Sequence, residues 1–91
     1  MPTARGSIAC AASGTVIYCF GGEGDTSNEN GIFAEVEAYD TVSDSWSVLS
    51  PMEVPRHGTG AVVLEGQIWI PGGGLTMAMA PTGVVDSFVT M

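Results

Sequence analysis

The chain has 91 residues and a mass of 9.3 kDa, enough for one small domain. Ten acidic residues face two arginines and no lysine, and the formal charge of −8 argues against nucleic acid and anionic membranes as partners. A hydrophobic content of 45% argues against disorder, and two cysteines without a Cys/His cluster exclude a disulfide scaffold or a zinc site.

Short apolar runs separated by glycines and other turn formers predict a series of antiparallel strands. In chain order, the expected strands span residues 6–13, 16–20, 35–40, 45–50, 57–64, 67–71 and 84–89. Gly14-Thr15 and Glu65-Gly66 are expected to form two-residue hairpin turns.

Pairing the first two strands about their turn places Cys10 opposite Cys19 and leaves both faces of the hairpin apolar. A sheet with two apolar faces is expected to lie between two other sheets. We therefore expect both thiols to be buried in a core and free, although the same register would also suit a disulfide.

The expected strands belong to a repeat of about fifty residues. Shifting the sequence by 51 residues aligns Arg5 with Arg56 and Gly21-Gly22 with Gly72-Gly73. Past the glycines the offset falls to 49, because the second copy has a shorter loop. The chain therefore divides into residues 1–51 and 52–91, and the second copy lacks its last strand.

Several of these residues together resemble the kelch repeat. The first copy has a hydrophobic strand that ends in Gly21-Gly22, followed by Tyr39-Asp40 and then by Trp46. The second copy has a strand with Trp69 that leads to Gly72-Gly73. The resemblance implies an all-β fold of four-stranded antiparallel blades from a β-propeller, here about two blades, the second without its outer strand. It also implies a scaffold role for these glycines and aromatic residues, with the aromatic rings packed between blades.

In such a meander, the link before the second copy and the loop at residues 23–34 lie at the same end of the sheets, and related propellers often bind partners there. The candidate binding residues on this rim are Arg5, Arg56, His57, Glu23 and Asp25. For the arginines we favour a different interpretation. Each would neutralise a buried carboxylate or carbonyl of its own repeat, such as Asp40.

Catalytic and metal sites find little support in the residues. His57 is the sole histidine, and no lysine follows the double glycines as a phosphate-binding loop would need. Residues 23–31 offer oxygen ligands for calcium, but Asn30 and Val36 stand where an EF-hand loop requires Gly and Glu. We expect a solvated loop here, and neither a metal nor a cofactor.

The sequence therefore predicts a non-catalytic protein-interaction module with a neutral or cationic protein partner. The alternative is a piece of a carbohydrate-active, galactose-oxidase-like propeller, whose copper site cannot be assembled from this chain alone. Two blades cannot close a ring, so we expect either the remainder of a longer propeller, which we favour, or several copies of the chain. Neither charge-free stretch, 6–22 or 66–85, makes a convincing signal peptide or membrane helix, and we favour a cytoplasmic location.

Overall fold

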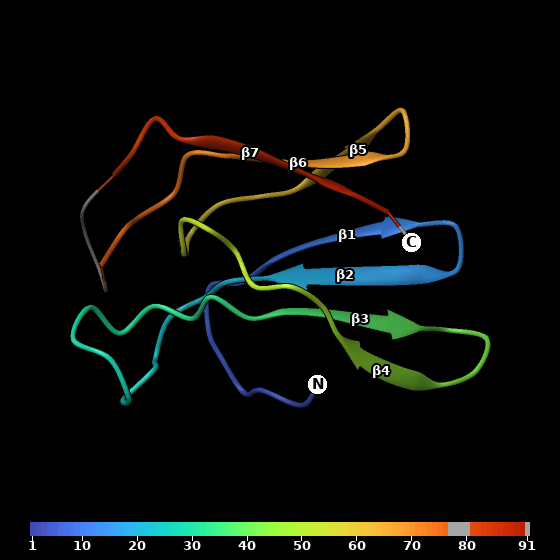
Figure 1. The fold of residues 1–91 in the computed structure, drawn as a ribbon, viewed down its shortest axis with the longest axis horizontal. Coiled ribbons are helices and arrows are strands. Elements are labelled where there is room, and N and C mark those ends of the chain that lie inside the picture. The colour runs from blue at the N-terminus through green and yellow to red at the C-terminus, as the bar shows by residue number, and fades with distance from the viewer. Residues whose placement is uncertain (77–80, 91) are drawn as a thin grey trace.

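A computed structural model describes residues 1–76 and 81–90, and all regular secondary structure in those ranges is β-strand (Figure 1). Sheet 1 has the strand order β1 (Ala9–Ser13), β2 (Val16–Phe20), β3 (Val36–Asp40) and β4 (Ser45–Val48). Sheet 2 has the order β5 (Val62–Leu64), β6 (Gln67–Pro71) and β7 (Val85–Val89). Every pairing is antiparallel, so the predicted all-β fold of one four-stranded and one three-stranded sheet is confirmed. The described residues contain no helix that could cross a membrane.

The strands follow the predicted ones closely except at the start of β1 and β5. We predicted strands from residues 6 and 57, but regular pairing begins only at Ala9 and Val62. The backbone of Ser7 has φ 51° and that of Gly58 has φ 65°, a left-handed conformation that an extended strand cannot include. The first residues of both predicted strands therefore belong to irregular links.

The register of the first hairpin is as predicted, with Cys10 opposite Cys19 and Ala12 opposite Ile17. Both thiols are free. Only Cys19 is buried, however, and the prediction that Cys10 is buried is wrong. Cys10 lies on the outer face of sheet 1, which no second sheet covers within the described ranges.

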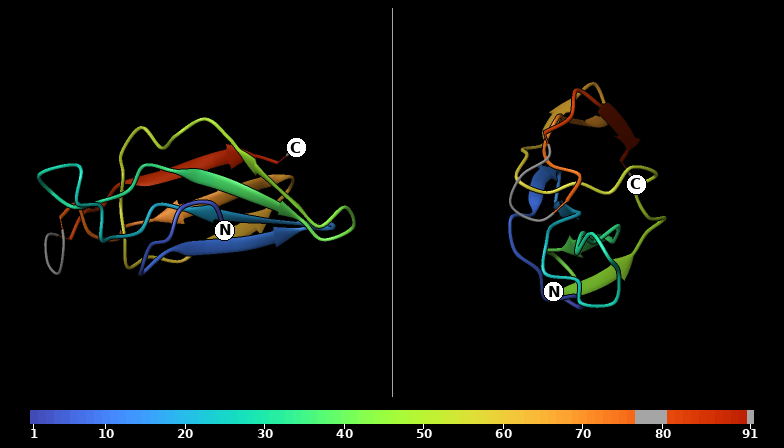
Figure 2. Two further views of the ribbon diagram at one scale, coloured as in Figure 1. Left: turned by 90° about the horizontal axis from the view of Figure 1, so that it is seen from below. Right: turned by 90° about the vertical axis from the view of Figure 1, so that its left-hand side faces the viewer.

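The hydrophobic core lies between the two sheets, which pack with one face of each against the other (Figure 2). Sheet 1 contributes the buried side chains of Tyr18, Phe20 and Val36, and sheet 2 contributes Ile68 and Ile70. Each sheet thus covers one face of the other. Within residues 1–76 and 81–90, the expectation that each sheet lies between two other sheets therefore holds for one face of each sheet.

The double glycines let backbone segments approach each other closely, between the two repeats at Gly21 and within the second repeat at Gly73. Gly21 has φ 64°, and a Cβ built on it would lie 2.2 Å from the carbonyl oxygen of Arg56. The neighbouring Gly22 donates its N–H to that same oxygen at 3.0 Å. In the second repeat, a Cβ on Gly73 would lie 2.8 Å from the oxygen of His57. Side chains at these positions would force the backbones apart.

The motif aromatics lie on the outer faces. The rings of Tyr39 and Trp46 pack on each other across β3 and β4, with centroids 5.1 Å apart. Trp69 lies on the outer face of sheet 2 and is 36% exposed. In the part of the chain that the structure describes, no second sheet lies against these three rings, so their packing between blades stays a prediction. Tyr18 and Phe88 instead occupy the interface.

Candidate functional site

The predicted rim exists at one end of the two sheets. The loops that follow β2 and β6 both lie at this end, opposite the hairpin turns (Figure 1). His57 links the two loops. Its Nδ1 lies 3.2 Å from Glu23 Oε2, and its Nε2 lies 2.6 Å from the carbonyl oxygen of Thr76. The sequence placed His57 and Glu23 on one rim, and the structure brings them into direct contact.

A glycine of the second repeat makes room for the His57 ring. His57 forms an isolated bridge with Gly74, and Gly6 forms the equivalent bridge with Glu23 in the first repeat. Gly74 therefore occupies the repeat position of Glu23. A Cβ on Gly74 would lie only 2.7 Å from His57 Nε2, and the His57 side chain is 9% exposed. His57 thus lies buried between the two loops, contacts both of them and orients Glu23; we call this contact the His57 clasp.

Asp25 organises the loop that follows Glu23. One carboxylate oxygen accepts the backbone N–H of Ser27 at 2.8 Å and the other accepts Asn28 Nδ2 at 2.8 Å. Hydrogen bonds from the Ser27 side chain and backbone hold the pKa of Asp25 below its ordinary value. Asn28 Oδ1 in turn accepts the N–H of Gly31 at 2.8 Å. The loop is therefore held in one conformation by its own side chains, and it presents Glu29 to solvent.

The Arg5 side chain is fully buried within the first repeat. Its Nη1 donates to the carbonyl oxygens of Gly21 and Glu35, and its Nη2 lies 2.8 Å from Glu37 Oε1. Thr3 Oγ1 donates to the second Glu37 oxygen at 2.7 Å. Burial by itself raises the pKa of Glu37. The hydrogen bonds from Thr3 and Arg5, with the charge of Arg5, outweigh that effect and hold this pKa below its ordinary value.

Arg56 repeats this arrangement in the second copy. Its Nη1 donates at 2.9 Å to the carbonyl oxygens of Gly72 and Val84, and its Nη2 lies 2.6 Å from Asp86 Oδ2. The interpretation we favoured, in which each arginine is neutralised within its own repeat, is what the structure shows.

Our prediction that Asp40 is a carboxylate partner of the arginines is wrong. Asp40 instead accepts the N–H groups of Val42 and Ser43 and caps its own turn. The true partners, Glu37 and Asp86, align with each other under the offset of 49, so the repeat itself carried the signal that we missed.

Burial of both arginines decides the charge of the surface. Each pairs with one acid, so ten acids minus two leave eight, which equals the net charge of −8. Neither arginine side chain is exposed. The acids outside the two pairs are Glu23, Asp25, Glu29, Glu35, Asp40, Asp44, Glu53 and Glu65. No group of three His, Cys, Asp or Glu side chains in residues 1–76 and 81–90 could hold a metal ion.

Paired antiparallel sheets with double-glycine approaches and a buried arginine in each repeat define a protein built from β-propeller blades. The Kelch motif model matches residues 4–53. The chain belongs to the kelch-repeat family.

Three relatives illustrate the match. Kelch-like protein terF of Aspergillus terreus is 43% identical over 88 residues, which cover 97% of this chain and 19% of that protein. Human Kelch-like protein 25 is 36% identical over 78 residues, 86% of this chain and 13% of that protein. Alpha-scruin of Limulus polyphemus is 33% identical, with 92% of this chain and 10% of that protein covered. The chain thus spans less than a fifth of the length of these relatives.

Proposed function

We propose that this chain is a non-catalytic kelch-repeat module that binds another protein through the rim of Glu23, the loop of residues 24–31 and His57. The observation that supports this proposal most directly is the clasp between His57 and Glu23, which joins the loops of two blades. Because the Asp25 hydrogen bonds also order the loop, binding there would cost little conformational entropy.

The proposed partner presents lysine or arginine side chains to this rim. Glu23 and the exposed Glu29 are acids outside the buried arginine pairs, and the surface carries no arginine or lysine side chain. A basic partner would gain from complementary charge, whereas an acidic one would be repelled. In this proposal Arg5 and Arg56 support the rim from inside and do not touch the partner.

A basic peptide of alternating lysine and serine, titrated into isotope-labelled protein, tests the rim. We expect NMR shift changes to concentrate in residues 23–31 and around His57. The double variant Glu23→Gln with Glu29→Gln should weaken binding by roughly tenfold, the scale of losing two charge pairs. The matched control is Asp44→Asn with Glu65→Gln, which removes the same charge at the opposite end. Equal weakening by both pairs would overturn the proposal, because it would mean that only net charge matters.

Two further points belong to this proposal. We propose that residues 1–51 and 52–91 act as two repeats of a closed ring, completed by further repeats or by other copies of the chain. We also propose a cytoplasmic location. Support comes from Cys10 and Cys19, which face each other across β1 and β2 as free thiols, as a reducing compartment would leave them.

A further inference from the structure

The two ring nitrogens of His57 both face oxygen atoms that accept hydrogen bonds. Nε2 lies 2.6 Å from the carbonyl oxygen of Thr76, and Nδ1 lies 3.2 Å from Glu23 Oε2. A carbonyl oxygen only accepts hydrogen bonds, and so does an ionised carboxylate. The His57 clasp therefore suits a ring that carries a proton on each nitrogen.

A ring with a single proton does not suit this geometry. The proton would stay on Nε2, because the Thr76 oxygen is the closer of the two oxygens and needs a donor. Nδ1 would then turn a lone pair toward the Glu23 carboxylate at 3.2 Å, and two acceptors repel each other. Loss of the second proton thus removes the attraction between His57 and Glu23.

Within residues 1–76 and 81–90, Glu23 is the charged side chain that lies against the His57 ring. On the other side the ring meets backbone, because Gly74 exchanges two backbone hydrogen bonds with His57 and Thr76 offers its carbonyl oxygen. Other charged side chains of the rim and its links have other partners or lie exposed: Arg5 pairs with Glu37, Arg56 with Asp86, Asp25 with Ser27 and Asn28, and Glu29 and Glu53 are exposed. One charge pair therefore determines how the clasp responds to pH.

A partner can reach Glu23 more easily than the ring beside it. The side chain of Glu23 is 28% exposed, whereas that of His57 is 9% exposed. A lysine or arginine that docks on Glu23 therefore meets a positive ring on the far side of the carboxylate. Because like charges disfavour each other at such range, binding of the cation favours loss of the ring proton.

We propose that the rim is regulated by protons: a lysine or arginine of the partner takes the place of the charged His57 ring beside Glu23, and the ring releases its Nδ1 proton to water. His57 is the sole histidine, and histidine changes its charge between about pH 5 and 8, so binding should strengthen as the pH rises through that range. This inference rests on the proposed function, because it names the regulation of the same site.

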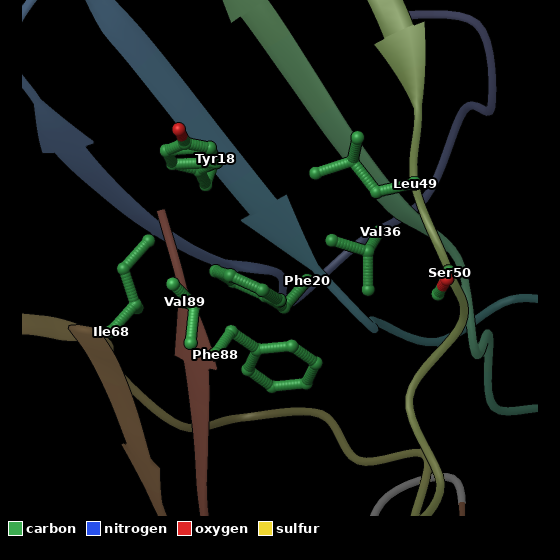
Figure 3. Close-up of a pocket in the computed structure, with 8 residues that line it drawn as sticks. All are labelled: Tyr18, Phe20, Val36, Leu49, Ser50, Ile68, Phe88 and Val89. Carbon is green, nitrogen blue, oxygen red and sulfur yellow. The ribbon is translucent and has the colours of Figure 1, made fainter. Parts of the chain in front are cut away.

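NMR of the unbound chain with ¹⁵N-labelled histidine tests the assignment of the protons. Between about pH 5.5 and 7.5, we expect Nδ1 to lose its proton while Nε2 keeps one. The backbone signals of Glu23 and Gly74 should follow the same curve. Ile68 and Phe88 are internal references, because they line the pocket between the two sheets (Figure 3), and their signals should stay in place.

The peptide of alternating lysine and serine, with its N-terminus acetylated, tests the coupling to binding. We expect its affinity to rise about tenfold from pH 5.5 to 7.5, the effect of releasing one proton over this range. Calorimetry in two buffers that differ in their enthalpy of protonation counts the protons. It should show about one proton released per peptide at pH 5.5 and almost none at pH 7.5.

Two variants assign the coupling to the clasp. His57→Gln keeps an amide donor but cannot titrate, so its affinity should change less than about twofold over the same range. Asp44→Asn is the matched control, because it also alters one polar side chain but lies at the opposite end of sheet 1. It should keep the tenfold rise of the original chain, about one proton's worth.

An affinity that stays constant or falls as the pH rises would overturn the proposal. So would an Nε2 that loses its proton before Nδ1, and this measurement on the unaltered chain does not depend on whether His57→Gln folds. Peptide binding at the rim without proton release overturns this inference and leaves the proposed function standing. A peptide that fails to bind the rim at either pH overturns both.

Discussion

Arg5 and Glu37 form an ion pair 2.8 Å long in which neither side chain is exposed to solvent. Arg56 and Asp86 repeat this pair in the second blade, where Asp86 remains 26% exposed. Each arginine also donates hydrogen bonds to backbone carbonyl oxygens of its own repeat. The pair therefore ties the link before each blade to the loop and strand that follow its double glycine.

Removing one member of the first pair should be costly. We expect Arg5→Met to lower the free energy of unfolding by about 3–5 kcal/mol, because Glu37 is left charged and buried. The double variant Arg5→Met with Glu37→Leu should recover most of that loss, since no buried charge remains. Urea unfolding followed by circular dichroism measures both. A single variant as stable as the original chain would contradict the role of the pair.

The same pair predicts loss of stability in acid. Since the pKa of Glu37 in the folded chain lies below its ordinary value of 4.5, the unfolded chain takes up a proton first as the pH falls. The stabilisation is therefore present above pH 4.5 and is lost as the pH falls through the folded pKa. Glu37→Gln should be less stable at pH 7 and should flatten the decline below pH 4.5. Glu53→Gln, an exposed control with the same charge change, should leave the decline in place.

A matched pair of glycine variants tests the close approach of the blades. Gly21 and Gly14 have nearly the same positive φ, 64° and 61°. A Cβ on Gly14 meets nothing within 4 Å, whereas one on Gly21 would lie 2.2 Å from the oxygen of Arg56. We expect Gly14→Ala to cost about 1 kcal/mol, the penalty of left-handed backbone alone. Gly21→Ala should cost several times more, and equal losses in thermal unfolding would show that the contact is unimportant.

Cys10 should react slowly for an exposed residue. Partial burial of the thiol, together with its hydrogen bond to Cys19, raises the pKa of Cys10 to about 12. Few molecules carry the reactive thiolate at pH 8, so alkylation by iodoacetamide should be roughly 50-fold slower than for an unperturbed thiol. Cys19→Ala removes the hydrogen bond and should speed the reaction. Mass spectrometry of the alkylated chain gives the rates, and a rate like that of glutathione would contradict the prediction.

The fold could be predicted from the sequence because hairpin turns and the repeat fix the register. Gly14-Thr15 places Cys10 opposite Cys19 whatever else the chain does, and the structure has that pairing. The starts of β1 and β5 could not be predicted. Ser7 at the start of the first predicted strand adopts a left-handed conformation, and a serine gives no sequence signal for that conformation. Local signals, in short, determine pairing better than they determine where pairing begins.

The site was predicted less completely than the fold. The positions of the two loops in the strand order were enough to predict that His57 and Glu23 lie on one rim. The partners of the arginines were missed, although Glu37 and Asp86 align with each other under the repeat offset of 49. The composition alone does not show that the side chains of Arg5 and Arg56 are both buried. Because they are buried, no arginine on the surface offsets the acidic side chains of the rim.

The repeat also gives the chain a polarity. Ala11 and Tyr18 lie on the face of sheet 1 that packs against sheet 2, and a shift of 51 carries them onto Val62 and Trp69. These last two lie on the outer face of sheet 2 and are exposed. The two outer faces are therefore different: that of sheet 2 corresponds to the packed face of sheet 1, and that of sheet 1 corresponds to the packed face of sheet 2. When the outer face of sheet 1 in one copy packs on the outer face of sheet 2 in the next, the stacking is head-to-tail, without a two-fold axis. Such a stack must either close into a ring or grow as a filament.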